Sequence, residues 1–465
     1  MEETIAILMC YATSNHWIQT WGPRKGNYGN CVSVDSLDNI YVASNSDEIG
    51  YDDISYLRKY DPVGNLLWVK NWGGNGYTRC YSATVDSAGF CYVGGGFSET
   101  VDFDPGIGVD SHTSNGVQDT FLVKFNADGK FQWARTWGGI SDDGGIGPTS
   151  CGPASIGVVG GFMESVDFDP GPGEEIRNAI GDGDVYISMF DLDGNFKWVN
   201  TWGSTDLDWG LGCTTDGQGN TYVTGFFEGP ADFDPSFSED ERTPLGDSDA
   251  FVSKFNSDGA YQWALTWGGE SRENAISISC NGIGSMYIHG GFRGVVDFDP
   301  GIGEDYQGVS GDTGVFLSKF NLSGEYEWAR TWKAYPKDFG FRVSSNSQGD
   351  VYCSGTFSDS VDFDPGPGED VHTPFKSGNR DAFLSKFDST GDHKWTQSWG
   401  GMSPSVQDRL DSTGIALDSL GNIYATGWFY VHVDFDPGPG EFMLDSSNSH
   451  LCDAYLSRFS PNGDW

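Results

Sequence analysis

The residues best suited to chemistry in this chain are pairs of aspartates in a recurring motif, Val/Ala-Asp-Phe-Asp-Pro. In an extended segment, side chains two residues apart point to the same side, so Asp102 and Asp104 are expected to face one way while Phe103 points inward. Two like charges held together cost free energy unless a cation or hydrogen-bond donors neutralise them. Because Ca²⁺ binds about six to eight hard oxygen ligands, paired carboxylates of this kind suit it.

A calcium site of this kind would draw on two groups of aspartates. The first group is the motif pairs: Asp102, Asp104, Asp167, Asp169, Asp232, Asp234, Asp297, Asp299, Asp362, Asp364, Asp434 and Asp436. The second group is one aspartate just before the expected third strand of five units: Asp119, Asp184, Asp249, Asp381 and Asp453. The same carboxylates could instead cap main-chain N–H groups, as in Asx turns. Since the spacing is not that of an EF-hand loop, both interpretations stay open.

A fixed repeat positions these aspartates. Successive copies of the motif are 65, 65, 65, 65 and 72 residues apart, with starts at Val101, Val166, Ala231, Val296, Val361 and Val433. A tryptophan that usually precedes glycine marks the same period, at Trp21, Trp72, Trp137, Trp202, Trp267, Trp332 and Trp399. Self-similarity at a fixed period is typical of repeat architectures, so seven marks predict seven units.

Each unit is expected to form four strands. In the unit that ends at Trp332, the expected strands are Ala275–Ser279, Met286–Phe292, Val315–Phe320 and Tyr326–Trp332. Turns rich in Gly and Asn join the first pair and the last pair, and a loop of about twenty residues carrying the Asp-Phe-Asp-Pro motif joins the second strand to the third. Four-stranded repeats arranged radially leave only short sheet edges. The predicted fold class is therefore all-β, a seven-bladed β-propeller of four-stranded antiparallel blades.

The two ends of the chain are expected to close this ring. Residues 16–21 resemble a fourth strand and Ala454–Phe459 resembles a third strand, so the N-terminal strand is predicted to complete the last blade. The propeller would then span 16–465 as one domain. Residues 1–15 are expected to be a leader or linker, because their apolar run follows two glutamates rather than basic residues and is too short to span a membrane. A fragment of a larger secreted protein fits the same features.

The strand order also predicts which loops share a face. In a four-stranded meander, the loop between strands two and three emerges on the same side as the connection to the next blade. The Asp-rich loops are therefore expected to share one rim with the Trp-Gly connections, with tight turns on the opposite face. Tryptophans four residues apart, such as Trp133 and Trp137, lie on one side of their strand. They could stack on a ligand, but their recurrence in every unit favours packing between blades.

Composition narrows the function further. The net charge of −41 disfavours nucleic acid and anionic lipid as partners and favours cations. Seventeen Trp and a 15% aromatic share supply a sizeable core. Nine Cys, with no CxxC spacing, are expected to be small buried thiols, with disulfides as the alternative. No segment is long and apolar enough to predict membrane insertion.

Three segments carry a family resemblance. The unit Asp249–Trp263, the segment Gly421–Gly427 and the repeated Val-Asp-Phe-Asp-Pro-Gly are similar to the SBBP-type bacterial β-propeller repeat. The resemblance covers residues 16–465 and implies a secreted or cell-surface location, with no agreed catalytic residues. The first unit departs from the pattern, because Trp21 and Trp72 are only 51 residues apart and Asn45 to Asp53 replaces the motif loop.

These features favour a binding or structural module over an enzyme. Six-fold repetition of the carboxylate pairs argues against one catalytic centre, and the seven histidines show no repeated or clustered arrangement in the sequence. The leading hypothesis is an extracellular or cell-surface propeller that binds a protein or assembles with itself through its acidic rim, with Ca²⁺ as a bridge. The alternative is a carbohydrate-binding propeller that uses exposed aromatics such as Trp209, Tyr306 or Trp428. A polysaccharide-active enzyme is the third hypothesis.

Overall fold

The computed structural model describes most of the 465 residues. The described ranges are 17–22, 26–48, 51–143, 149–152, 154–236, 238–309, 313–334, 342–376, 379–401, 410–447 and 451–465. The leader or linker expected at 1–15, His16 and His450 lie outside these ranges.

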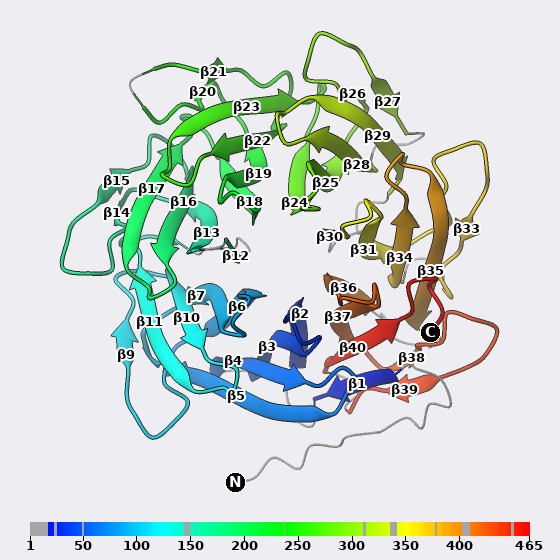
Figure 1. The fold of residues 1–465 in the computed structure, drawn as a ribbon, viewed down its shortest axis with the longest axis horizontal. Coiled ribbons are helices and arrows are strands. Elements are labelled where there is room, and N and C mark those ends of the chain that lie inside the picture. The colour runs from blue at the N-terminus through cyan, green and yellow to red at the C-terminus, as the bar shows by residue number, and fades with distance from the viewer. Residues whose placement is uncertain are drawn as a thin grey trace.

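Seven four-stranded antiparallel blades surround a central axis (Figure 1). The first strand of each blade lies nearest the centre and the fourth lies outermost (Figure 1). The strand boundaries expected for the unit ending at Trp332 agree with the observed ones to within one residue. The predicted fold class is confirmed.

The blades are numbered along the chain, and their strands run from the centre outward. They are blade 1, β2 (Gly26–Val34), β3 (Ile40–Glu48), β4 (Tyr51–Tyr60), β5 (Leu66–Gly74); blade 2, β6 (Thr78–Val85), β7 (Cys91–Phe97), β10 (Asp119–Phe125), β11 (Phe131–Trp137); blade 3, β12 (Thr149–Cys151), β13 (Ser155–Phe162), β16 (Asp184–Asp191), β17 (Phe196–Trp202); blade 4, β18 (Trp209–Thr215), β19 (Thr221–Phe227), β22 (Asp249–Phe255), β23 (Tyr261–Trp267); blade 5, β24 (Asn274–Cys280), β25 (Ser285–Phe292), β28 (Gly314–Asn321), β29 (Tyr326–Lys333); blade 6, β30 (Arg342–Ser345), β31 (Val351–Phe357), β34 (Asp381–Phe387), β35 (His393–Gly401); and blade 7, β36 (Leu410–Leu417), β37 (Ile423–Phe429), β40 (Asp453–Phe459), β1 (Trp17–Trp21).

The N-terminal strand closes the ring as predicted. Strand β1 pairs antiparallel with β40, from Trp17 opposite Arg458 to Trp21 opposite Ala454. The last blade is therefore built from both ends of the chain. Backbone hydrogen bonds fix β1 in blade 7, and the chain then continues into β2 of blade 1, which closes the ring.

Tryptophans of the fourth strands pack between blades. The second tryptophan of each pair meets aromatic residues of the next blade, as Trp72 does with Phe125 at 5.3 Å and Trp137 with Phe190 at 5.1 Å between ring centroids. The first tryptophan lies over a turn of the next blade, as Trp68 does over Gly129. These contacts support packing between blades rather than a ligand platform.

The motif loops contain strand pairs that the sequence did not predict. Each loop in blades 2 to 7 folds into an insertion hairpin of two short antiparallel strands at the periphery of the ring (Figure 1). Two or three residues are too few to show an alternating pattern in the sequence. The hairpin strands are β8 (Thr100–Asp102) and β9 (Ser111–Thr113), β14 (Ser165–Asp167) and β15 (Ile176–Asn178), β20 (Ala231–Asp232) and β21 (Glu241–Arg242), β26 (Val295–Asp297) and β27 (Tyr306–Gly308), β32 (Val361–Asp362) and β33 (Val371–His372), and β38 (His432–Asp434) and β39 (Met443–Asp445).

The cysteines whose side chains the structure describes are free thiols. Five are buried and two are half-buried. Burial raises the pKa of the Cys80 thiol to about 12, so this side chain behaves as a small apolar group. The described cysteines are Cys31, Cys80, Cys91, Cys213, Cys280, Cys353 and Cys452.

Candidate functional site

The insertion hairpins and the Trp-Gly connections lie on one rim, as the strand order predicts. Gly73, which follows Trp72 at the end of blade 1, pairs with Asp102 in the hairpin of blade 2. Gly400 at the end of blade 6 pairs in the same way with Asp434 of blade 7. The hairpins of blades 2 and 7 are therefore fixed to the preceding blade by backbone pairing. The hairpins of blades 3 to 6 form separate two-stranded sheets on the same rim, which we call the insertion-bearing rim.

The first aspartate of each motif caps both ends of its hairpin loop. In blade 2, Asp102 Oδ1 accepts the N–H of Asp104 at 3.2 Å and that of Asp110 at 2.9 Å. Phe103 between the paired aspartates is fully buried, with its ring centroid 5.1 Å from that of Phe121. The equivalent aspartates accept the same pair of bonds at Asp167, Asp232, Asp297, Asp362 and Asp434.

The second aspartate shapes the turn that follows. Asp104 Oδ1 accepts the N–H of Gly106 at 2.8 Å, and a β-carbon at Gly108 would lie 2.2 Å from Asp104 Oδ2. The loop is thus wrapped around this carboxylate, and a side chain at position 108 would force the carboxylate to move. The corresponding bond recurs at Asp169, Asp234, Asp299, Asp364 and Asp436.

These bonds are the ones that the capping interpretation requires. They leave the Ca²⁺ interpretation as a prediction, because each aspartate keeps a second carboxylate oxygen. Within the described ranges, no group of three or more His, Cys, Asp or Glu side chains is arranged to hold a metal ion.

The aspartates before the third strands do not join the motif pairs. Asp119 is buried at the start of β10, where its Oδ2 accepts the N–H of Asn115 at 2.9 Å. Burial, together with the nearby carboxylate of Asp143, raises the pKa of Asp119 to about 6. The equivalent residues Asp184, Asp249, Asp381 and Asp453 are buried too and each accepts a loop N–H.

Sequence reasoning missed a second buried acid in three blades. Asp143, Asp208 and Glu273 lie in the connections from blades 2, 3 and 4 to the next blade. Each follows the aspartate that begins the third strand of the preceding blade by 24 residues, and this fixed interval is the signal that could have found them. Glu273 is fully buried, and its two oxygens accept the N–H groups of Gly269 at 2.7 Å and Arg293 at 3.3 Å. Burial raises its pKa to about 7, with a further contribution from Asp249. These buried pairs of acids hold the loops of the rim in place.

Exposed apolar side chains lie among the acidic loops of the rim. Ile107 and Ile302 occupy hairpin tips and are completely exposed. Ile180 and Leu245 lie in the loops that lead from hairpin to third strand, and their N–H groups bond at 3.1 Å to the buried Asp184 and Asp249. The rim therefore presents apolar groups on backbone that the buried acids fix.

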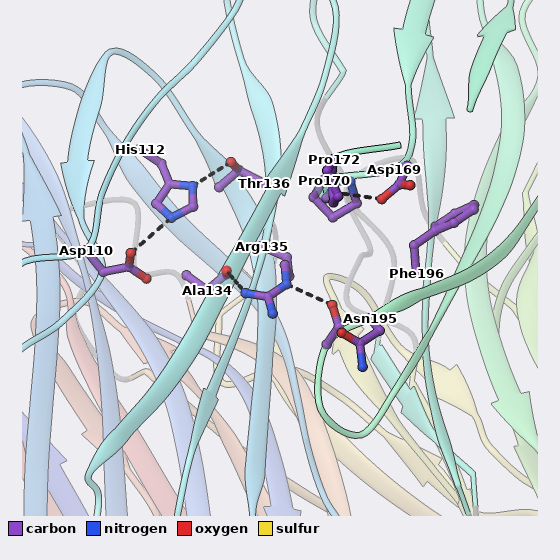
Figure 2. Close-up of a pocket in the computed structure, with 12 residues that line it drawn as sticks. Asp110, His112, Ala134, Arg135, Thr136, Asp169, Pro170, Pro172, Asn195 and Phe196 are labelled. Atoms are coloured by element: carbon purple, nitrogen blue, oxygen red, sulfur yellow. Dashed lines mark hydrogen bonds and ion pairs between the residues drawn. The ribbon is translucent and has the colours of Figure 1, made fainter. Parts of the chain in front are cut away.

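A groove separates blades 2 and 3 at the periphery (Figure 2). One wall carries His112, whose Nδ1 lies 2.8 Å from Thr136 Oγ1, and Arg135, whose Nε donates to Gly194 O at 2.8 Å. The other wall is the motif turn of blade 3 and the tight turn before β17 (Figure 2). The cavity has a volume of about 490 Å³ and is lined by Asp110, His112, Ala134, Arg135, Thr136, Asp169, Pro170, Gly171, Pro172, Gly194, Asn195 and Phe196.

The histidines are more ordered than the sequence suggested. His112 and His372 occupy the same place in their hairpins, each with Nδ1 bonded to a hydroxyl of the fourth strand, and His372 and His393 both approach Asp370. The expectation that no repeated or clustered arrangement exists is therefore wrong. The interval of 260 residues between His112 and His372, four repeats of 65, was the signal for it.

The aromatics expected to contact carbohydrate are placed differently from the prediction. Trp209 begins β18 and Trp428 lies in β37, and both are half-buried strand residues rather than exposed loop residues. Tyr306 alone of the three is exposed. The ring of Trp428 instead packs edge-on against Tyr28 at 5.5 Å.

Comparisons with known proteins give distant similarities. No family model matches the chain. It is 30% identical over 146 residues to regulatory protein FlaEY of Caulobacter vibrioides, covering 31% of this chain and 15% of that protein. It is 24% identical over 231 residues to an uncharacterized WD repeat-containing protein, L264, of Acanthamoeba polyphaga mimivirus. This match covers 44% of this chain and 16% of that protein. The matched part spans about a sixth of the length of each relative.

Solved structures that align with almost the whole chain have lower sequence identity than these relatives. A subtype N10 neuraminidase-like protein of A/little yellow-shouldered bat/Guatemala/060/2010 aligns over 98% of this chain and 95% of its own, at 9% identity and a TM-score of 0.34. The lignostilbene dioxygenase of Pseudomonas brassicacearum aligns over 98% of this chain and 93% of its own, at 9% identity and a TM-score of 0.29. At these scores neither carries an argument about activity. Among the described residues, no helix has the length and apolar character needed to cross a membrane.

Proposed function

We propose that this propeller is a non-catalytic, protein-binding or self-assembling module that acts through its insertion-bearing rim. The observation that carries the proposal is the exposure of apolar side chains such as Ile107 and Leu245 on rigidly held, acidic loops. Isolated exposed apolar residues are common on proteins. Here they recur at equivalent positions of several blades on one rim, which is the composition of a binding surface.

Charge indicates the chemistry of the partner. With a net charge of −41, the chain attracts a basic surface and repels an acidic one. A partner with Lys or Arg around an apolar patch would match both features of the rim. Self-assembly would need cations between copies, and Ca²⁺ held by motif aspartates such as Asp104 is the bridge we propose for that case.

The location we propose is extracellular or at the cell surface. The support is the likeness of the repeat to SBBP-type units together with the acidic composition. The non-catalytic role follows from repetition: six hairpins carry the same aspartate pair, with the same bonds, so no one blade is singled out as a reaction centre.

Two measurements test the proposal. Sedimentation velocity of the purified chain in millimolar Ca²⁺ and in chelator tests self-assembly, and capture of surface proteins from the source organism by the immobilised chain tests for a partner. A Ca²⁺-dependent oligomer, or a basic protein retained in stoichiometric amount and released by salt, supports the proposal. A chain that stays monomeric in both buffers and retains no protein contradicts it.

A further inference from the structure

The peripheral groove between blades 2 and 3 has a counterpart between blades 5 and 6. On the first wall, Arg330 and Thr331 stand where Arg135 and Thr136 stand, at an interval of 195 residues. On the second wall, the turn that follows Asp364 replaces the one that follows Asp169. The volumes are about 490 and 560 Å³, within the range of about 300–1,000 Å³ typical of small-molecule sites.

An arginine distinguishes these two junctions from the other five. The arginine Nε of each groove donates at 2.8 Å to a turn carbonyl of the next blade, Gly194 O or Gly391 O. Shorter side chains make the same bond elsewhere, since Gln19 reaches Gly64 O at 3.1 Å and Asn200 reaches Gly259 O at 2.7 Å. The other equivalent positions hold Lys70, Leu265 and Gln397. Joining the blades therefore does not require arginine.

The guanidinium brings donors that the junction does not use fully. Arg135 Nη1 donates to Ala134 O at 2.7 Å, and its Nη2 has only a 3.5 Å contact with Asp193 O. Arg330 Nη1 donates to Ala329 O at 2.8 Å and its Nη2 to Thr390 O at 3.0 Å, which still leaves one N–H on each terminal nitrogen. A guanidinium presents five N–H donors in a fixed plane, so the outer edge of Arg135 can donate into the groove. Figure 2 shows this side chain lying between the wall that carries His112 and the turn that carries Asn195.

The charges of the groove select an uncharged ligand. Each groove combines one arginine with two aspartates, Asp110 and Asp169 in the first and Asp364 and Asp392 in the second. An anion would meet two carboxylates on a strongly acidic protein, and a cation would meet the guanidinium. Closely spaced donors and acceptors instead suit a ligand with many hydroxyl groups, each of which both donates and accepts.

We propose that the two grooves are equivalent binding sites for a neutral oligosaccharide. In each site the arginine donates to ring hydroxyls, and the two aspartates that line the groove accept from them. In the first groove the half-buried ring of Phe196 provides one flat surface for a sugar face. Because each groove is open to solvent, affinity per site is expected to be modest, with a Kd on the order of 1 mM. This binding does not depend on the rim acting as a protein-binding surface.

Titration calorimetry with unsubstituted gluco-, galacto-, manno- and xylo-oligosaccharides of two to four units tests the proposal. The structure predicts that at least one series binds with two equivalent sites per chain. Arg135→Gln should leave one site, and Arg135→Gln combined with Arg330→Gln should weaken binding at least tenfold. Glutamine is the chosen replacement because Gln19 shows that it keeps the bond between blades. Lys70→Gln is the matched control, since Lys70 holds the equivalent strand position but lines neither groove.

The calorimetry gives different results if the proposal is right and if it is wrong. Two sites per chain, lost in the double variant and kept in the Lys70 variant, support the proposal. No heat of binding from any series at tens of millimolar overturns it, as does binding that survives the double variant. Thermal melting of each variant checks that the fold is retained, so that unfolding is excluded as the cause of a loss of binding.

Discussion

The indole of Trp133 lies over Gly194 of the next blade, so closely that a β-carbon at Gly194 would come within 2.9 Å of the ring. The same contact between a fourth-strand tryptophan and a turn glycine occurs at all seven junctions. It includes Trp17 over Gly64, where the N-terminal strand meets blade 1. One repeated contact thus joins every blade to the next.

Replacing that glycine should destabilise the propeller. Gly194 has a φ of +80°, so Gly194→Ala would combine a strained backbone with a clash against Trp133. We expect a loss of about 2 kcal/mol or more in the free energy of unfolding, measured by denaturant titration. Gly282→Ala is the control, because Gly282 has a φ of +71° with open space around it. Equal losses in the two variants would mean that the tryptophan contact has no effect.

Closure of the ring predicts a second stability effect. Trp21 of β1 is buried beneath the Arg58 guanidinium, which lies 4.7 Å from its ring centroid, and next to Tyr60 of blade 1. Trp21→Ala should therefore cost about 3–5 kcal/mol, as should Trp137→Ala at an internal junction. Denaturant titration of both variants checks this. A full loss for Trp137→Ala beside almost none for Trp21→Ala would show that the N-terminal strand is not docked.

The sequence predicted the ring because its markers are structural. Trp21 and the later tryptophans recur with the period of the blades, and the likeness of residues 16–21 to a fourth strand predicted the closure. The insertion hairpins were missed because Thr100–Asp102 and its partner are too short to show a pattern. Spatial neighbours from different parts of the chain, such as Asp119 and Asp143, could be inferred only from a repeated interval.

The buried acids predict an unusual dependence of stability on pH. The pKa of Glu273 is raised to about 7 and that of Asp249 to about 6, above the unfolded values of about 4.3 and 3.9. The folded state therefore holds protons that the unfolded state has released between about pH 4 and pH 7. The stabilisation is complete below about pH 4 and is lost as pH rises through the folded pKa values. The free energy of unfolding should fall from pH 5 to pH 8.

A single substitution isolates this contribution. Glu273→Gln removes the titrating group, so the fall in stability between pH 5 and pH 8 should shrink by about 2.5 kcal/mol. The readout is the slope, because Gln also alters the bonds to Gly269 and Arg293. Asp191→Asn should leave the slope unchanged, since hydrogen bonds from Asn195 lower the pKa of Asp191. An identical slope in wild type and Glu273→Gln would refute the assignment.

Calcium binding by the motif aspartates predicts a rise in thermal stability. If residues such as Asp104 complete Ca²⁺ sites in the folded chain only, saturation at about 100 times Kd adds about 2.7 kcal/mol per site. The melting temperature should then rise by several degrees between chelator and millimolar Ca²⁺. Mg²⁺ at equal concentration is the control, because it demands a tighter octahedral site. An unchanged melting temperature would contradict Ca²⁺ binding by the motif aspartates and leave capping of main-chain N–H groups as their role.

The location of the grooves shows what periodicity could not supply. Arg135 and Asp169 are 34 residues apart and belong to different blades, yet they line one cavity. Only the angle between neighbouring blades brings a fourth strand opposite the next motif turn. The sequence identified Asp169 and Asp364 but not Asp110 or Asp392. It also missed the arginine, because Arg occurs at this strand position in only two units.

The most direct test of the account is whether binding follows the insertion-bearing rim. The rim variant carries Ile107→Asp, Leu245→Asp and Ile302→Asp, and the matched control carries Leu37→Asp, Ile283→Asp and Leu420→Asp in the tight turns of the opposite face. All six side chains are exposed, so neither variant should lose stability. Affinity capture and sedimentation velocity should show that the partner or oligomer is lost with the rim variant and kept with the control. Equal binding by the two variants, or loss with the opposite-face variant alone, would contradict the proposed role of the rim.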